Sequence, residues 1–184
     1  MPAGQKQAVM TEIPIPLDGV VDFLVELLNT PSPTGYHAEA TAVVRRAFEA
    51  LAAPSLAVEI TAKGALSLTW RGDASDATRG LTAHLDTLGL MVKEIKPSGR
   101  LKVTPLGGIM WGGIEMEGVT VQTQDGRRWR GTVVPVNPSL HVNRNIATAE
   151  RSADTMEIRL DARTASAAET RALGIEVGDF IFID

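Results

Sequence analysis

The chain of 184 residues contains no cysteine, no long apolar run and no excess of basic charge. The absence of cysteine excludes disulfides and thiolate chemistry, and it fits a reducing cytoplasmic location. The net charge of -4 argues against the basic surface that nucleic-acid binders carry. Apolar runs are too short for a membrane span, and residues 1–12 lack the apolar core of a signal peptide. A hydrophobic fraction of 44% supports a folded core, so we expect a cytoplasmic globular protein that binds neither nucleic acid nor a membrane.

Residues 17–92 have the pattern of an α/β unit, and they follow a polar tail at residues 1–16. Apolar residues recur first at helical spacing and then in alternation, with turn residues between the segments. Thr34 is placed to cap the second helix. The last segment is almost continuously apolar, which is typical of a strand covered on both faces. The predicted elements are helices at 17–28 and 36–51, hairpin strands at 56–61 and 65–70, and a strand at 81–86.

Residues 93–184 differ in character, because short strands alternate with frequent glycine, asparagine and proline turns. This pattern predicts a small β-barrel or sandwich interrupted by one helix. Thr164 or Ser166 is placed to cap that helix, Glu169 to complete a capping box, and Gly174 to end it. Strands are predicted at 101–106, 119–123, 129–134, 156–161 and 177–183, and the helix at 165–173.

His84 and Asp86 interrupt the apolar segment and are the best candidates for chemistry. Side chains two apart in a strand share a face, a neutral imidazole binds divalent metals, and a nearby carboxylate fixes its tautomer. However, zinc sites need three or four ligands, and a histidine in an apolar strand is more often a buried core residue. The residues alone leave both interpretations open. His37 is predicted to be a surface or capping residue, and His141 is a weak candidate in a loop.

A series of short motifs, taken together in their order and spacing, resembles one protein family. The motifs are Pro31-Ser32-Pro33-Thr34-Gly35, Ala83-His84-Leu85-Asp86, Leu90-Met91-Val92, Pro105-Leu106-Gly107-Gly108, Leu173-Gly174-Ile175 and Val177-Gly178-Asp179-Phe180. From about residue 17 onward, the chain resembles the tetrahedron-forming (TET-type) dinuclear metallo-aminopeptidases, which include glutamyl and deblocking aminopeptidases. Thr87 and the loop around His141 resemble a branch that is encoded beside genes for an acetylated dipeptide-amide osmoprotectant.

The resemblance implies a hydrolase with two divalent metals per active site, usually zinc or cobalt, that acts on peptides. It implies an α/β catalytic domain, here partial, with an inserted β-barrel dimerisation domain. His84 corresponds to a metal ligand, and Asp86 to the catalytic residue that orients it. Self-association through the barrel is implied, as a dimer and, for a full-length chain, as a dodecamer.

The chain departs from the family pattern at two points. Thr87 stands where members commonly have glutamate. The other metal ligands and the Glu-Glu pair that supplies the general base lie beyond the inserted domain in the family, whereas these residues end at Asp184. We therefore expect the polypeptide to continue, and the 184 residues alone to be inactive and to bind metal weakly. We also expect residues 17–92 to lack the rest of their sheet, so that a strand such as 81–91 has an uncovered face or edge.

Two other functions remain open from the sequence. The barrel could be a non-catalytic assembly or binding module, with the Trp111-containing glycine loop as a contact surface. A related metallo-deacylase of acylated amino acids would share the His-x-Asp chemistry, but its inserted domain is typically an α/β sandwich. The reading frame after Asp184 separates the module from the peptidase.

Overall fold

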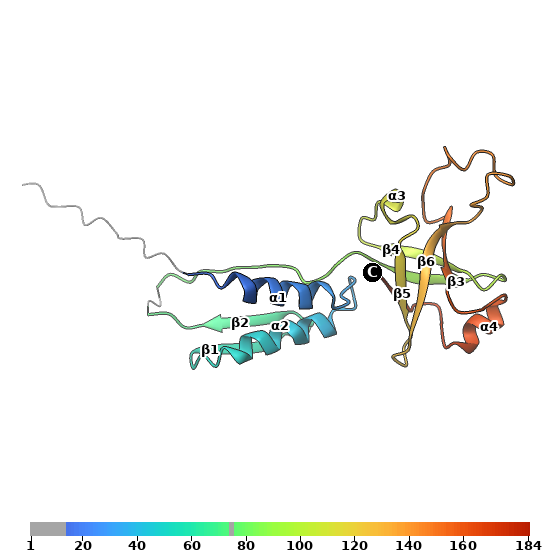
Figure 1. Cartoon of the computed structure of the whole chain (residues 1–184). Helices are drawn as coiled ribbons and strands as arrows, with labels where there is room; N and C mark the ends of the chain where they lie inside the picture. Colours follow the sequence, from blue (N-terminus) through green and yellow to red (C-terminus); the bar gives the residue numbers. More distant parts are fainter. Residues whose placement is uncertain (1–13, 74–75) are drawn as a thin grey trace, which may run out of the picture.

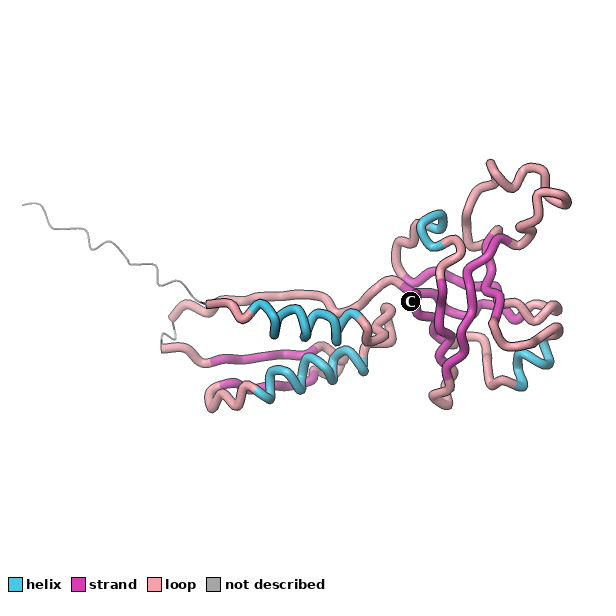
Figure 2. The backbone as a smooth tube through the Cα atoms, viewed as in Figure 1, coloured by secondary structure: helices cyan, strands magenta, loops and turns pink. Residues whose placement is uncertain are grey.

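The computed structural model describes residues 14–73 and 76–184, which form two units joined side by side (Figure 1). The N-terminal unit contains two helices and a β-hairpin, and strands dominate the C-terminal unit (Figure 2). The N-terminal elements are α1 (Leu17–Leu28), α2 (Ala38–Ala50), β1 (Leu56–Ile60) and β2 (Leu66–Trp70). β1 and β2 pair antiparallel with Leu56 opposite Trp70, and Gly64 at φ +84° allows the turn between them.

Helix α1 is amphipathic, yet its apolar side chains are exposed in the described part of the chain. Val20, Val21, Leu24, Val25 and Leu28 are 48–68% exposed. By contrast, α2 buries Ala40, Thr41, Val43 and Val44. The exposed apolar stripe of the N-terminal unit therefore lies on α1, whereas the sequence predicted an uncovered face for a strand at 81–91. Within the described residues, no helix is both long and apolar enough to cross a membrane.

Six antiparallel strands of the described chain close into a barrel, which confirms the predicted fold class. The strands are β3 (Gly89–Ile95), β4 (Leu101–Leu106), β5 (Gly118–Gln122), β6 (Arg128–Pro135), β7 (Met156–Leu160) and β8 (Phe180–Ile183). Their spatial order is β3-β4-β7-β6-β5-β8, and β8 pairs with β3 to complete the circle. Alternate residues point inward, and Leu90, Leu101, Val119, Val133 and Ile158 are fully buried.

Two short helices complete the barrel unit. α3 (Trp111–Ile114) lies between β4 and β5, and its terminal residues pack partly buried against the core. α4 (Ala167–Ala172) begins at the predicted Ser166 N-cap, whose hydroxyl accepts the Glu169 N–H at 3.3 Å. The Glu169 carboxylate accepts the Ala165 N–H at 2.6 Å, one residue before the Ser166 N–H that the predicted capping box would use. Gly174 at φ +85° ends the helix.

Two predictions about local structure are wrong. Residues 81–86 form no strand, because no other strand of the described chain pairs with their backbone groups. The strand instead begins at Gly89, where both β4 and β8 supply partners. Thr34 does not cap α2, which begins at Ala38 without a side-chain cap bond, and His37 occupies the N-cap without capping it. The division of the chain into domains at residues 92 and 93 stays a prediction, and β3 runs through that position.

The barrel closes by different means at its β4–β7 seam than elsewhere. Within the described chain, β4 and β7 register at one pair, Leu101 with Ile158, whereas β6 and β7 register at five. At this seam, ion pairs between side chains supplement the sparse backbone pairing. The Glu157 side chain, only 3% exposed, accepts hydrogen bonds from Lys96 at 2.6 Å and Arg100 at 2.5 Å. Glu157 therefore joins the β3–β4 hairpin to β7 through an ion pair on each oxygen of its buried carboxylate.

We expect Glu157→Gln to lower the free energy of unfolding of the barrel by about 3 kcal/mol, because it leaves two partly buried cations without a counter-charge. The matched control is Asp154→Asn, which breaks the exposed Lys102–Asp154 pair at the same seam and should cost less than about 1 kcal/mol. Denaturant unfolding followed by the fluorescence of the two barrel tryptophans, Trp111 and Trp129, in a Trp70→Phe background measures both values. Equal losses in the two variants would show that the buried carboxylate does not close the seam.

Candidate functional site

His84 and Asp86 lie in the extended segment 81–88, which connects the N-terminal hairpin to β3. The His84 Nδ1 atom lies 3.0 Å from the backbone oxygen of Asp86 and 3.5 Å from its carboxylate Oδ1. The structure therefore brings together the two residues that the sequence selected, although they do not share a strand. The His84 side chain is 86% exposed, so it is not a buried core histidine.

Asp86 is held from its other side by Thr34. The Thr34 hydroxyl donates to Asp86 Oδ2 at 2.7 Å, and this bond is the main cause that lowers the pKa of the Asp86 carboxyl below 3.8. The charges of His84 and His37 lower the pKa further. The carboxylate is therefore ionised at neutral pH, with one oxygen bonded to Thr34 and the other facing the imidazole.

The donor set suits one corner of a metal site but does not complete one. With Nδ1–H donating to a backbone oxygen, a neutral His84 keeps its Nε2 lone pair free for a metal. Across residues 14–73 and 76–184, no group of three or more His, Asp or Glu side chains could hold a metal ion. His141 lies exposed in the loop between β6 and β7, and it belongs to no such group within those residues. The described residues therefore supply one imidazole ligand and its orienting carboxylate.

A cluster of five residues ties the start of α2 to the barrel, and sequence reasoning missed it. The Tyr36 ring lies 5.3 Å, between ring centroids, from both Phe180 and Phe182 of β8. The Tyr36 hydroxyl donates to Glu39 at 2.7 Å, and Arg128 Nη2 donates to both Glu39 oxygens at 3.0 and 3.1 Å. We call these five residues the interdomain latch. No local sequence signal links Glu39 to Arg128, because the two residues are 89 positions apart.

The Gly178-Asp179 motif has a structural explanation. Asp179 is only 2% exposed, its Oδ2 accepts the Glu176 N–H at 2.8 Å, and its backbone oxygen accepts the Val92 N–H at 2.9 Å. Burial raises the pKa of the Asp179 carboxyl, since the charged form is desolvated. Asp179 thus fixes the turn that leads into β8, at some distance along the chain from the candidate site.

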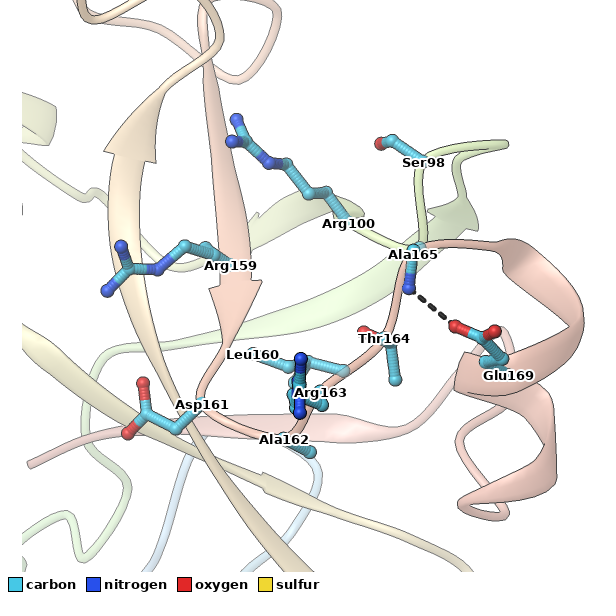
Figure 3. A pocket seen from close by; sticks show the side chains of 11 residues that line it. Ser98, Arg100, Arg159, Leu160, Asp161, Ala162, Arg163, Thr164, Ala165 and Glu169 are labelled. Carbon is cyan, nitrogen blue, oxygen red and sulfur yellow. Dashed lines mark hydrogen bonds between the residues drawn. The ribbon is translucent and has the colours of Figure 1, made fainter.

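A hollow of about 870 Å³ lies between the β3–β4 turn, the segment that follows β7, and α4 (Figure 3). Arg100, Arg159 and Arg163 line it together with Asp161 and Glu169. The Glu169 carboxylate faces the Ala165 N–H, to which it is bonded, and Arg100 is paired with Glu157. Neither His84 nor Asp86 reaches this hollow, so it is separate from the candidate site.

Comparison with known proteins identifies the family. A family model described as "M42 glutamyl aminopeptidase" matches residues 64–184, which is well over half of the chain, and the chain belongs to this family. The putative aminopeptidase YhfE of Bacillus subtilis (strain 168) is 39% identical over 164 residues, which cover 89% of this chain and 46% of that protein. The lysyl aminopeptidase of Pyrococcus furiosus is 26% identical over 85% of this chain and 43% of its own length. The chain thus spans a little under half the length of these relatives.

Solved structures share the fold. A TET aminopeptidase from the marine sediment archaeon Thaumarchaeota archaeon SCGC AB-539-E09 superposes with a TM-score of 0.73 at 24% identity, over 91% of this chain and 45% of that one. The Pyrococcus horikoshii TET1 peptidase, which is described as assembling into a tetrahedron or a large octahedral shell, gives 0.68 at 21% identity over 89% and 46%. The predicted resemblance to the TET-type aminopeptidase family is confirmed by the family match and by this shared fold, whereas the assignment to its osmoprotectant-associated branch stays a prediction.

The interdomain latch should weaken on acidification. The hydrogen bond from Tyr36, with that from Arg128, lowers the pKa of Glu39 below 4.5, so the contact is complete above pH 4.5 and is lost as pH falls through the lower folded-state value. We expect the amide chemical shifts of Phe180 and Phe182 to change over that range. Glu39→Gln should remove the acid transition, and a transition of the same size in this variant would assign it to other groups.

Proposed function

We propose that this chain forms the N-terminal part of a metal-dependent aminopeptidase, which removes N-terminal residues from peptides. Membership of the M42 family supports the reaction class. The observation that carries the proposal is the contact of the His84 imidazole with Asp86. His84 is exposed, its Nδ1 lies 3.0 Å from the Asp86 backbone oxygen, and its Nε2 is left as the ligand atom.

The proposed division of work follows from the contacts of these residues. His84 binds a divalent metal, zinc or cobalt, through Nε2, and Asp86 keeps the ring in the tautomer that leaves this nitrogen free. A divalent metal at such a site supplies Lewis-acid polarisation of the peptide carbonyl. Thr34 keeps the Asp86 carboxylate ionised and oriented. The barrel carries the segment that bears these residues, since β3 begins three residues after Asp86.

The remaining metal ligands and the general base come, in this proposal, from polypeptide beyond these 184 residues. The chain spans less than half of its relatives, and the described residues hold no three-ligand group. The exposed apolar face of α1 is consistent with further packing on this unit. The chain by itself is then inactive. We also propose self-association through the barrel, as relatives with this fold are described as a dodecamer and as a tetrahedron.

Titration of the 184-residue chain with zinc should reveal only weak binding, because a single imidazole does not make a zinc site. His84→Ala should abolish the weak binding at this position, whereas His141→Ala, which removes an exposed histidine from a barrel loop, should leave it unchanged. Isothermal titration calorimetry measures both. A tight stoichiometric site that survives His84→Ala would contradict the assignment.

The activity itself should be assayed on the native protein from its source cells, with aminoacyl p-nitroanilides as substrates. We expect hydrolysis that a chelator stops and that zinc or cobalt restores. Asp86→Asn should lower activity or metal affinity by about 10–100-fold, as for other residues that orient a metal-binding histidine. Hydrolysis that chelators and Asp86→Asn both leave intact would rule out the proposed function.

A further inference from the structure

The loop from Ser32 to Tyr36 contacts the site segment on one side and the barrel on the other. Toward the site, the Ser32 backbone oxygen accepts the Thr87 N–H at 2.7 Å, and Pro33 forms a parallel bridge with Thr87. The Pro33 ring also leaves no room for a side chain at Gly89, where an added Cβ would lie 2.4 Å from Pro33 Cβ. The 32–36 loop therefore fixes the backbone directly after Asp86.

The same loop is anchored to the barrel by Tyr36. Its ring packs against both Phe180 and Phe182, its hydroxyl donates to Glu39, and Arg128 donates to the same Glu39 carboxylate. Gly35, at φ +96°, turns the chain between Thr34 and Tyr36. A Cβ atom added at Gly35 would lie 3.5 Å from the Phe180 ring, so this turn sits directly against β8. Thr34 is thus held between two fixed points, Pro33 against Gly89 and Tyr36 against β8.

Thr34 is the side chain that fixes the rotation of the Asp86 carboxylate. Among the described residues, its hydroxyl is the side-chain donor to Asp86 Oδ2, at 2.7 Å. With Oδ2 engaged, Oδ1 faces His84 Nδ1 at 3.5 Å, which reinforces the contact of that nitrogen with the Asp86 backbone oxygen. Both side chains are otherwise well exposed, at 86% and 44%, so packing alone does not orient them.

We propose that Thr34 is a positioning residue that selects the His84 tautomer through Asp86. The hydroxyl holds the carboxylate so that two oxygens of Asp86 attract the Nδ1–H proton, and Nε2 is left unprotonated and facing solvent. This inference deepens the proposed function by adding a residue to the His84 site. Its physical content, a tautomer preference, exists without any metal.

The test is to measure the His84 tautomer in the metal-free 184-residue chain by long-range ¹H–¹⁵N NMR. Spectra are recorded at about pH 8.5, where imidazoles are ordinarily neutral. The His84 signals are identified by their loss in His84→Gln. We expect the Nδ1–H form to dominate in the unmodified chain, and its ratio to the Nε2–H form to fall about fivefold in Thr34→Val, as for the loss of one hydrogen bond.

Two controls separate positioning from a general effect on structure. Thr34→Ser keeps the hydroxyl and should restore the original ratio. Thr148→Val removes an exposed hydroxyl that bonds a backbone oxygen in a barrel loop, and it should leave the ratio unchanged. Unchanged β3 and β8 amide shifts in Thr34→Val show that the variant is folded, and Thr34→Ala replaces it if those shifts move.

A ratio that stays the same in Thr34→Val, or that Thr34→Ser fails to restore, would overturn the proposal. Neither result depends on catalysis, because no metal or substrate is present. Conversely, a native protein without peptidase activity would end the proposed function while leaving the tautomer result intact.

Discussion

The closure of the barrel at the β4–β7 seam is the constraint on which the rest of the structure depends. Backbone pairing is sparse there, and Glu157 replaces it by accepting from Lys96 and Arg100 across the seam. A buried carboxylate is costly unless it is fully paired, so this arrangement favours one register of the hairpin against β7. Once β3 is fixed, β8 pairs with it at Gly89, Leu90 and Met91. The first residues of β3 therefore lie beside β8, the last strand of the barrel.

The fixed position of Gly89, where β3 begins, determines where the candidate site can lie. Asp86 is three residues from the start of β3, and the 32–36 loop binds the segment between them. The interdomain latch then joins that loop to β8. The 32–36 loop is therefore attached to the barrel through β8, and the site segment is attached to it through β3. The N-terminal unit buries less of its apolar surface than the barrel does, as the exposed apolar side chains of α1 show. The barrel thus supplies a fixed support for the imidazole and carboxylate of the candidate site.

The sequence predicted those features that depend on neighbouring residues. The helix at 17–28, the β1–β2 hairpin and the Ser166 N-cap of α4 follow from local spacing and local hydrogen bonds. The strand at 81–86 failed because a strand needs a neighbour, and local composition does not show whether one is present. The Thr34 cap failed for a related reason, since its hydroxyl bonds Asp86, which is 52 positions away.

The candidate site followed the same division. His84 and Asp86 were found because a polar pair inside an apolar run is visible locally. Thr34 was visible only as part of a turn motif, and the Glu39–Arg128 pair of the latch was not visible at all. The contacts that hold the site in place join distant segments, and they become apparent only when the barrel brings β6 and β8 against the start of α2.

The central claim is that the barrel holds the site-bearing segment through the 32–36 loop. Hydrogen exchange of the Thr87 amide tests this claim most directly, because that N–H donates to the Ser32 oxygen at 2.7 Å and lies outside every strand. We expect the Thr87 amide to be protected to within about tenfold of the slow amides of β3 and β8. A Thr87 amide that exchanges at the rate of an unfolded peptide, while the barrel amides stay slow, would contradict the account.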